Sequence, residues 1–307
     1  MITYNHEHFI KEAILGVLSQ ECSYDIELVI TDDCSTDNTE AVVKSLQSHP
    51  RGGIIKYIRQ PKNRGVFNNA ILNLENCKGD FIAFCEGDDY WIDPLKLQKQ
   101  IEIMETNQEV VLTFTSRIVQ EADLTEVKSI WPEIFWSKND IYAYGTVFPT
   151  QTMVGRNYQV ELINFISLFP DSFGFDKIIG YFYCLKGKVQ SIEDVTAVYR
   201  HNGLGVWSRL SNEEKKVLHI DQSLMFLTTI VKEKIDESIS LEELKYLLFL
   251  RIINNNLDDS KFLKFLFKKY NLSNKLKLIA IGNGVKTDIK SVIKYYLNSS
   301  RNYLSKL

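Results

Sequence analysis

The sequence predicts an α/β fold in which helices cover both faces of a mostly parallel sheet, followed by a distinct C-terminal region. Short apolar runs of strand length alternate with longer amphipathic runs over the first 110 residues, and the connections between them are short. Acidic residues follow directly after two of the strand-like runs, at the strand ends where open α/β sheets bind ligands. The last part of the chain is basic and amphipathic.

Hydrophobic periodicity predicts the first elements. Five apolar residues at spacings of three and four predict a helix over 8–20 with one buried face. They are Ile10, Ala13, Ile14, Val17 and Leu18. A strand is expected at 27–31, followed by a helix that runs to about His49. Asp37 or a neighbour is expected to cap this helix, with Glu40 closing a capping box.

The alternation continues to about residue 107. Further strands are expected at 54–59 and 81–85, and further helices at 66–76 and 94–107. Pro94 suits the first turn of the last of these helices. The carboxyl ends of the parallel strands should gather the acidic residues on one rim of the sheet.

The start of the chain departs from this scheme. Residues 1–5 are typical of the end of a strand, not of a whole strand. We therefore expect an N-terminally shortened form in which the body of the first strand is missing. Losing a central strand would expose its two neighbours.

Composition favours an ordinary cytoplasmic enzyme. Hydrophobic residues make up 45% of the chain and charged residues 24%, which are globular values. The five cysteines form no CxxC pair, so we expect reduced thiols instead of disulfides or a zinc site. No signal peptide or membrane-spanning run is predicted.

Charge is concentrated at the C-terminal end. Residues 261–307 contain eleven Lys or Arg and one acidic residue, Asp288, whereas the rest of the chain carries 25 basic and 38 acidic residues. Basic amphipathic segments favour peripheral contact with an anionic membrane. The alternative is a helical appendage packed on the acidic body. A nucleic-acid partner is not expected, because no aromatic-lined basic sheet or helix-turn-helix pattern accompanies the charge.

The acidic loop after the 81–85 strand is the strongest chemical signal. Glu86, Asp88 and Asp89 would repel one another there unless a cation holds them. Mg²⁺ or Mn²⁺ carrying a phosphorylated ligand is the usual solution, because hard cations take carboxylate and phosphate oxygens. The alternative is a solvated acidic loop that caps the following helix.

An ordered set of motifs resembles the family 2 glycosyltransferases. Thr3-Tyr4-Asn5-His6-Glu7, Asp32-Asp33-Cys34-Ser35-Thr36-Asp37, Asn63-Arg64-Gly65, Glu86-Gly87-Asp88-Asp89-Tyr90-Trp91 and Tyr199-Arg200 followed by Gly205-Val206-Trp207-Ser208 occur in order. The resemblance covers 1–208 and implies a GT-A fold and transfer with inversion. It implies a nucleotide-sugar-binding half at 1–110 and an acceptor and catalytic half at 111–208. Residues 209–307 carry none of these motifs, and we expect them to form a helical basic C-terminal region.

The resemblance also assigns roles in binding a nucleotide-sugar donor. Thr3 and Tyr4 would border the nucleobase. Asp32 would hydrogen-bond uracil or ribose, with Asp33 beside it, and Asn63 and Arg64 would lie near the base or the diphosphate. Asp32 and Asp33 are also good helix caps, a role compatible with donor binding.

The acidic loop occupies the place of the family's Asp-x-Asp motif. Asp88 would bind Mn²⁺ or Mg²⁺, Glu86 would face the ribose, and Asp89 would share the metal or orient its waters. Glu86 is one methylene longer than the usual Asp, which puts its direct contact in doubt. His201 is a further metal or diphosphate candidate, although it stands one residue before the usual position; a loop histidine without such a role is the alternative.

The resemblance places the catalytic base at the start of a helix that precedes a Lys-Gly-Lys turn, a strand and Tyr-Arg. Asp176 fits this layout and Asp171 is the second candidate. A helix N-terminus would lower the basicity of Asp176, so burial against Phe173, Phe175 or sugar must offset it. Trp207 is a candidate for stacking on a sugar or base, with packing as the alternative.

The sequence thus favours an enzyme that transfers a sugar from a nucleotide-sugar donor, expected to be a UDP-sugar, to a glycan or lipid-linked acceptor. We expect it to act in cell-surface polysaccharide synthesis at the inner face of the plasma membrane. The acceptor pocket is expected within 130–170, with Trp131, Phe135, Trp136 and Tyr142. A nucleotidyltransferase would need a Gly-rich basic loop after the first strand, and 3–8 contains none. A non-catalytic glycosyltransferase-like binding protein is the second alternative.

Overall fold

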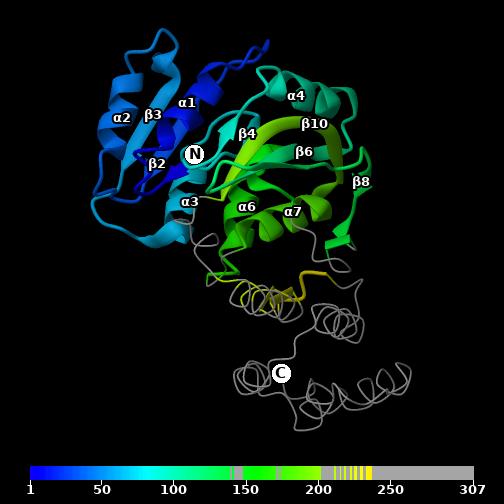
Figure 1. The fold of residues 1–307 in the computed structure, drawn as a ribbon. Coiled ribbons are helices and arrows are strands. Elements are labelled where there is room, and N and C mark those ends of the chain that lie inside the picture. The colour runs from blue at the N-terminus through cyan, green and yellow to red at the C-terminus, as the bar shows by residue number, and fades with distance from the viewer. Residues whose placement is uncertain are drawn as a thin grey trace, which may run out of the picture. The chain divides into compact units, whose positions relative to one another are not determined.

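The structure, a computed structural model, describes residues 1–138, 140–141, 148–170, 172, 174–201 and scattered positions between 211 and 236 (Figure 1). The chain divides into two compact units. The first comprises Met1–Ile141 and Thr146–Arg209, and the second Tyr142–Gly145 and Leu210–Leu307. All contacts discussed below lie within the first unit. Of the regions singled out in the sequence, the basic segment 261–307 lies outside the described residues, as do Tyr142, Asp171, Phe173 and Trp207.

The N-terminal sheet has three parallel strands in the order β1-β2-β3. They are β1 (Ile2–Thr3), β2 (Leu28–Asp32) and β3 (Ile55–Arg59). Every residue of β2 is buried, as the apolar run predicted. A two-residue strand, β1, occupies the place of the strand expected to be missing, and it pairs Ile2 with Thr31 and Thr3 with Asp32.

Helices follow these strands as predicted: α1 (Ile10–Leu18), α2 (Thr39–Leu46) and α3 (Gly65–Glu75). The predicted apolar face of α1 is buried in full. The predicted capping box at α2 is wrong. Asp37 accepts the Thr39 N–H at 2.9 Å, but Glu40 forms ion pairs with Lys44 at 2.6 Å and with Arg59 at 3.2 Å. Two nearby cations thus attract the carboxylate away from the helix end.

The second sheet is mixed and has seven strands, with the path β4-β9-β6-β10-β5. These are β4 (Phe81–Ala83), β9 (Val154–Arg156), β6 (Val110–Glu121), β10 (Lys188–His201) and β5 (Tyr90–Trp91), with β7 (Glu126–Ser129) beside β6 and β8 (Phe135–Trp136) beside β10. The long strands β6 and β10 are parallel, and the other named pairings are antiparallel. A parallel bridge between Ile2 and Glu86 links the two sheets.

Helices cover this sheet on both faces. In Figure 1, α4 (Lys96–Thr106) lies on one side of β6 and β10, and α6 (Gln159–Ile166) and α7 (Phe175–Lys186) lie on the other. Double coverage explains why the first half of β6 is buried at every position. No helix of the described part of the chain is long and apolar enough to span a bilayer. The five cysteines are free thiols, of which Cys85 alone is buried.

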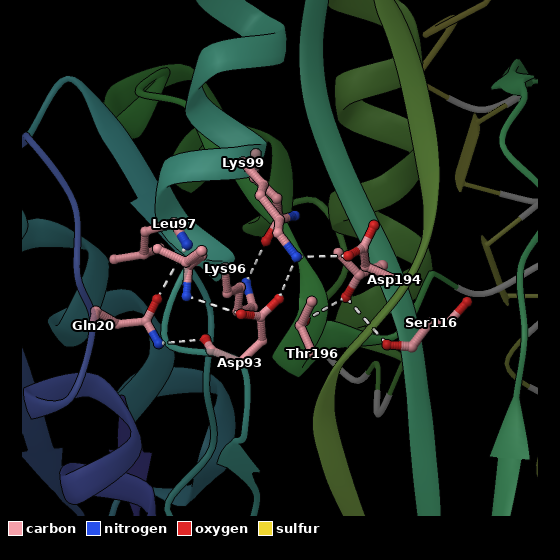
Figure 2. A network of polar contacts seen from close by, with 11 residues as sticks. Gln20, Asp93, Lys96, Leu97, Lys99, Ser116, Asp194 and Thr196 are labelled. Atoms are coloured by element: carbon pink, nitrogen blue, oxygen red, sulfur yellow. Dashed lines mark hydrogen bonds and ion pairs between the residues drawn. The ribbon is translucent and has the colours of Figure 1, made fainter.

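A polar network holds the segment after β5 in place (Figure 2). Gln20, just after α1, donates to Asp93 O at 2.8 Å and accepts the Leu97 N–H at 3.1 Å. Lys99 bridges the carboxylates of Asp93 and Asp194, with Nζ–O distances of 2.8 and 2.6 Å. The network connects α1, α4 and β10, so it fixes the strand and the loop that precede α4.

Lys96, at the start of α4, is completely buried. Its Nζ donates to Gln100 Oε1 at 2.6 Å and to Thr152 O at 3.3 Å, and lies 4.5 Å from the centroid of a Trp91 ring. Burial lowers the pKa of this amine to about 7. Its hydrogen-bond partners are uncharged, so the cost of burying a charge is offset only in part.

Candidate active site

The carboxylate of Asp32 accepts hydrogen bonds from nearby side-chain and backbone groups. Asp32 is buried at the end of β2. Its Oδ1 accepts the Ser35 N–H at 2.8 Å and the Ser35 hydroxyl at 2.6 Å, and its Oδ2 accepts the Tyr57 hydroxyl at 2.5 Å. Burial and this carboxylate raise the pKa of Tyr57. A donor contact to Asp32, as predicted, would add to these bonds or replace one of them.

Asp33 anchors the loop that begins α3. Its Oδ1 accepts the Arg64 N–H at 2.7 Å and Gln60 Nε2–H at 3.1 Å, and its Oδ2 accepts the Gly65 N–H at 2.8 Å. Gly65 has φ +84°, a conformation that favours glycine. The predicted capping role is therefore present, but it acts on a helix more than thirty residues away. The side chains of Asn63 and Arg64 are left exposed at this rim.

The acidic loop is fastened to the N-terminal segment. Gly87 donates its N–H to Ile2 O at 3.0 Å. A Cβ at Gly87 would lie 2.8 Å from Thr3 Oγ1 and 2.9 Å from His6 Nδ1. Both of those buried atoms lack a hydrogen-bond partner in the described structure. Tyr4, by contrast, is 43% exposed. The structure therefore brings Thr3, one of the two predicted nucleobase residues, into direct contact with the acidic loop.

Asp88 and Asp89 differ in their surroundings. Asp88 Oδ2 lies 3.9 Å from His6 Nε2 and is partly exposed. Asp89 is 1% exposed; its Oδ1 accepts the Arg200 N–H at 2.9 Å, and its Oδ2 has no partner among the described residues. Burial, with Asp88 beside it, raises the pKa of Asp89 well above its usual range, and raises that of Glu86 as well. Mutual repulsion of this kind favours a cation.

Arg200 holds the acidic loop from the opposite side. Its Nη1 donates to Asp88 O at 2.8 Å, its Nη2 pairs with Glu12, and its guanidinium lies 4.1 Å from the Tyr90 ring centroid. In the sequence, Arg200 belongs to the Tyr199-Arg200 motif, but no role is assigned to it. The structure assigns it to positioning the loop, a function that depends on contacts more than one hundred residues apart.

Asp176 lies in the first turn of α7 and is half-buried. Its Oδ1 accepts the Lys177 N–H at 2.8 Å. Burial nevertheless raises the pKa of Asp176, outweighing the helix N–H bond and the nearby charges of Lys177 and Arg117. Burial therefore offsets the lowering of the Asp176 pKa by the helix N-terminus, as a catalytic base at this position requires. Asp176 and the carboxylate of Glu86 are also close enough to interact electrostatically.

His201 ends β10 and pairs with Glu121, with Nδ1 and Oε2 2.6 Å apart. This pairing uses one ring nitrogen of the residue predicted as a possible metal ligand. No group of three or more His, Cys, Asp or Glu in the described part of the chain converges on a common metal position. Asp88 and the unpartnered Asp89 Oδ2 supply two hard oxygen ligands, which suit Mg²⁺ or Mn²⁺ if donor phosphates complete the coordination.

The predicted acceptor aromatics form a packed cluster. Trp131 and Trp136 lie with ring centroids 5.3 Å apart, and both pack on Phe114 of β6. Trp136 Nε1 donates to Ser191 Oγ at 2.8 Å, whereas the buried Trp131 Nε1 has no partner among the described residues. Phe135 is 54% exposed. Trp131 and Trp136 therefore pack on a core residue while remaining partly buried, and Phe135 lies at the surface.

A family model and several known proteins match this chain. The family model "Glycosyl transferase family 2" matches residues 1–163. An uncharacterized protein of Mycobacterium tuberculosis is 27% identical over 220 residues, covering 70% of this chain and 61% of its own length; the chain thus spans less than two thirds of that relative. The Escherichia coli protein WfaP, named as a UDP-Glc:alpha-D-GlcNAc-diphosphoundecaprenol beta-1,3-glucosyltransferase, is 31% identical over 132 residues, covering 43% of this chain and 50% of its own.

Solved structures show the fold. Staphylococcus aureus TarS 1–349 in complex with UDP has a TM-score of 0.51 at 15% identity, covering 100% of this chain and 90% of that one. The mannosyltransferase PcManGT of Pyrobaculum calidifontis, in complex with GDP-Man and Mn²⁺, has a TM-score of 0.51 at 13% identity, covering 100% and 86%. Because the family model matches more than half of the sequence, this chain belongs to glycosyl transferase family 2, and it has the GT-A fold.

Proposed function

We propose that this chain is a metal-dependent, inverting glycosyltransferase. It moves a sugar from a UDP-sugar to a hydroxyl of a glycan or lipid-linked acceptor in cell-surface polysaccharide synthesis. One observation carries the proposal. A buried carboxylate oxygen of Asp89 has no partner among the described residues, and Asp176, almost ninety residues along the chain, lies near enough to the acidic loop for its charge to act on Glu86.

The donor lies along the rim formed by β1, β2 and the start of α3. Thr3 and Tyr4 border the base, Asp32 and Asp33 stand at the end of β2, and Asn63 and Arg64 lie beside it. The unpartnered Thr3 Oγ1 and the exposed side chains of Tyr4, Asn63 and Arg64 support this assignment. Asp33 serves indirectly, by holding the Arg64 and Gly65 amides in place. The UDP complex of TarS supports uracil as the base.

Asp88 and Asp89 hold a divalent cation, with His201 as a further ligand if it leaves Glu121 or uses its other ring nitrogen. When bound, the cation neutralises charge on the departing diphosphate. Glu86 faces the ribose of the donor. The Mn²⁺ in the PcManGT complex supports a metal in this fold.

Asp176 acts as the general base. Its carboxylate takes the proton from the acceptor hydroxyl while the hydroxyl oxygen attacks the sugar carbon opposite the leaving nucleotide. A pKa raised by burial supports this role, because proton transfer is most effective when the base's pKa approaches the working pH.

The acceptor and the cellular site are proposed from a relative's name and from the charge of the C-terminal end. The acceptor printed in the name of WfaP is a sugar on diphosphoundecaprenol. A lipid-linked acceptor of this chemistry would agree with the basic segment 261–307 contacting an anionic membrane from the cytoplasmic side.

Calorimetry with UDP and GDP, with and without Mn²⁺, tests the proposed donor site. We expect UDP to bind more tightly than GDP and only weakly without Mn²⁺. Asp88→Asn should remove the effect of the metal, whereas Lys128→Gln, on exposed β7, should not. Absence of nucleotide binding under all of these conditions would reject the proposed function.

A further inference from the structure

Arg117 of β6 is a cation at the site that the sequence did not single out. It pairs in register with Ala197 of β10 and Ser129 of β7. Its guanidinium lies 4.7 Å from the centroid of the Tyr199 ring. Its Nε–H is buried and has no hydrogen-bond partner within the described structure. A buried donor without a partner is unfavourable, and more so when the group is charged.

The surroundings of Arg117 are acidic. Its charge acts on Glu86 and Asp89 of the acidic loop and on Asp176 of α7, in each case opposing the rise in the carboxyl pKa. No hydrogen bond or ion pair joins Arg117 to these carboxylates in the part of the chain that the structure describes. Arg200, the other arginine beside the acidic loop, is already engaged, because it pairs with Glu12. Arg117 therefore combines a central position with unused donors.

We propose that Arg117 binds a phosphate oxygen of a reactant and forms an oxyanion subsite beside the acidic loop and Asp176. A guanidinium presents N–H donors in a planar fork that matches phosphate, and stacking on an aromatic ring leaves the edge of that fork available. The Arg117 guanidinium lies over the Tyr199 ring, a contact that restrains its position. The inference rests on the proposed function, because the transfer reaction brings phosphate to this site.

Two sources of phosphate fit the subsite: the diphosphate of the donor and a phosphate group on the acceptor. Titration of the full chain with UDP, UMP and uridine in Mn²⁺ tests the first. If Arg117 contacts the donor, Arg117→Gln should weaken binding of a phosphorylated ligand by about tenfold or more, with uridine unchanged. Titration of the UDP-loaded protein with inorganic phosphate tests the second; there the same variant should lose phosphate binding while UDP affinity is kept.

Two controls separate recognition from folding. Arg117→Lys keeps the charge but not the planar fork, so its affinity for the phosphorylated ligand should lie between those of wild type and Arg117→Gln. If Arg117→Gln does not fold, the affinity of Arg117→Lys tests the proposal. Lys128→Gln removes one positive charge from exposed β7 of the same sheet and should leave the binding of every ligand unchanged.

The results that overturn the inference are distinct from those that overturn the function. Unchanged binding of all three uridine ligands and of inorganic phosphate in both Arg117 variants overturns the subsite alone. An equal loss of affinity for uridine and for UDP also overturns the subsite, because such a loss indicates a structural effect of the substitution. Failure of the wild-type protein to bind any nucleotide with Mn²⁺ overturns both.

Discussion

Replacing Lys96 by Met should change how the stability of this protein depends on pH. Burial lowers the pKa of Lys96 to about 7 in the folded state, from a usual value of 10.5. The unfolded chain therefore binds the additional proton between these values, so the free energy of unfolding rises with pH in this window. The unfavourable contribution of Lys96 is fully present below pH 7 and disappears above pH 10.5. Met carries no such charge and removes the dependence.

The size of the effect follows from the shift in pKa. One pKa unit corresponds to about 1.4 kcal/mol. Because Lys96 is half charged at pH 7, wild type should gain about 2 kcal/mol relative to Lys96→Met between pH 7 and pH 9. The hydrogen bonds to Gln100 and Thr152 are lost at every pH, so they affect the absolute difference between the two proteins but not its slope.

Chemical unfolding at pH 7, 8 and 9, followed by tryptophan fluorescence, measures this slope. Lys99→Met is the matched control, because Lys99 lies on the same helix but pairs with Asp93 and Asp194, which raise its pKa (Figure 2). Lys99 stays charged in both states over this range, so its variant should differ from wild type by a constant amount. If Lys96→Met also differs by a constant amount, Lys96 is protonated throughout and the argument from burial is wrong.

The site gives four further predictions. Asp176→Asn should spare UDP binding in calorimetry but lower turnover by orders of magnitude; surviving turnover would show that another group is the base. Asp88→Asn should raise the Mn²⁺ concentration needed for half-maximal turnover, and an unchanged requirement would exclude Asp88 as a ligand. Gly87→Ala forces a Cβ against Thr3 and His6, so it should cost about 1–3 kcal/mol of stability and weaken UDP binding; wild-type values for both would refute the tight packing. Deleting 261–307 should reduce binding to anionic vesicles in a salt-dependent way, and unaltered sedimentation with vesicles would exclude a membrane role for this segment.

Local sequence signals predicted the elements of the N-terminal half well. The periodicity of α1 and the apolar run of β2 each depend on residues close together in the chain, and both elements formed where expected. The family resemblance placed Asp176 at the start of a helix, and α7 begins there. The second sheet was predicted less well, because its antiparallel pairings, such as β4 with β9, join segments more than seventy residues apart.

Side-chain partners within the site were largely beyond prediction. Asp33 was expected near the donor or capping its own helix, yet it fixes the amides of Arg64 and Gly65. Arg117 carried no motif, and its position depends on the register of β6 with β10. Local spacing gives the type of residue at a strand end, but not which distant backbone group will reach it.

The bond between the Arg200 amide and the Asp89 carboxylate has a spectroscopic consequence. Most strand amides hydrogen-bond to a neighbouring strand, so their proton exchange reports on the sheet. The Arg200 amide instead reports on a buried carboxylate of the acidic loop. Its proton chemical shift and exchange rate should follow the charge on Asp89, which makes this single backbone resonance a direct sensor of whatever neutralises that charge.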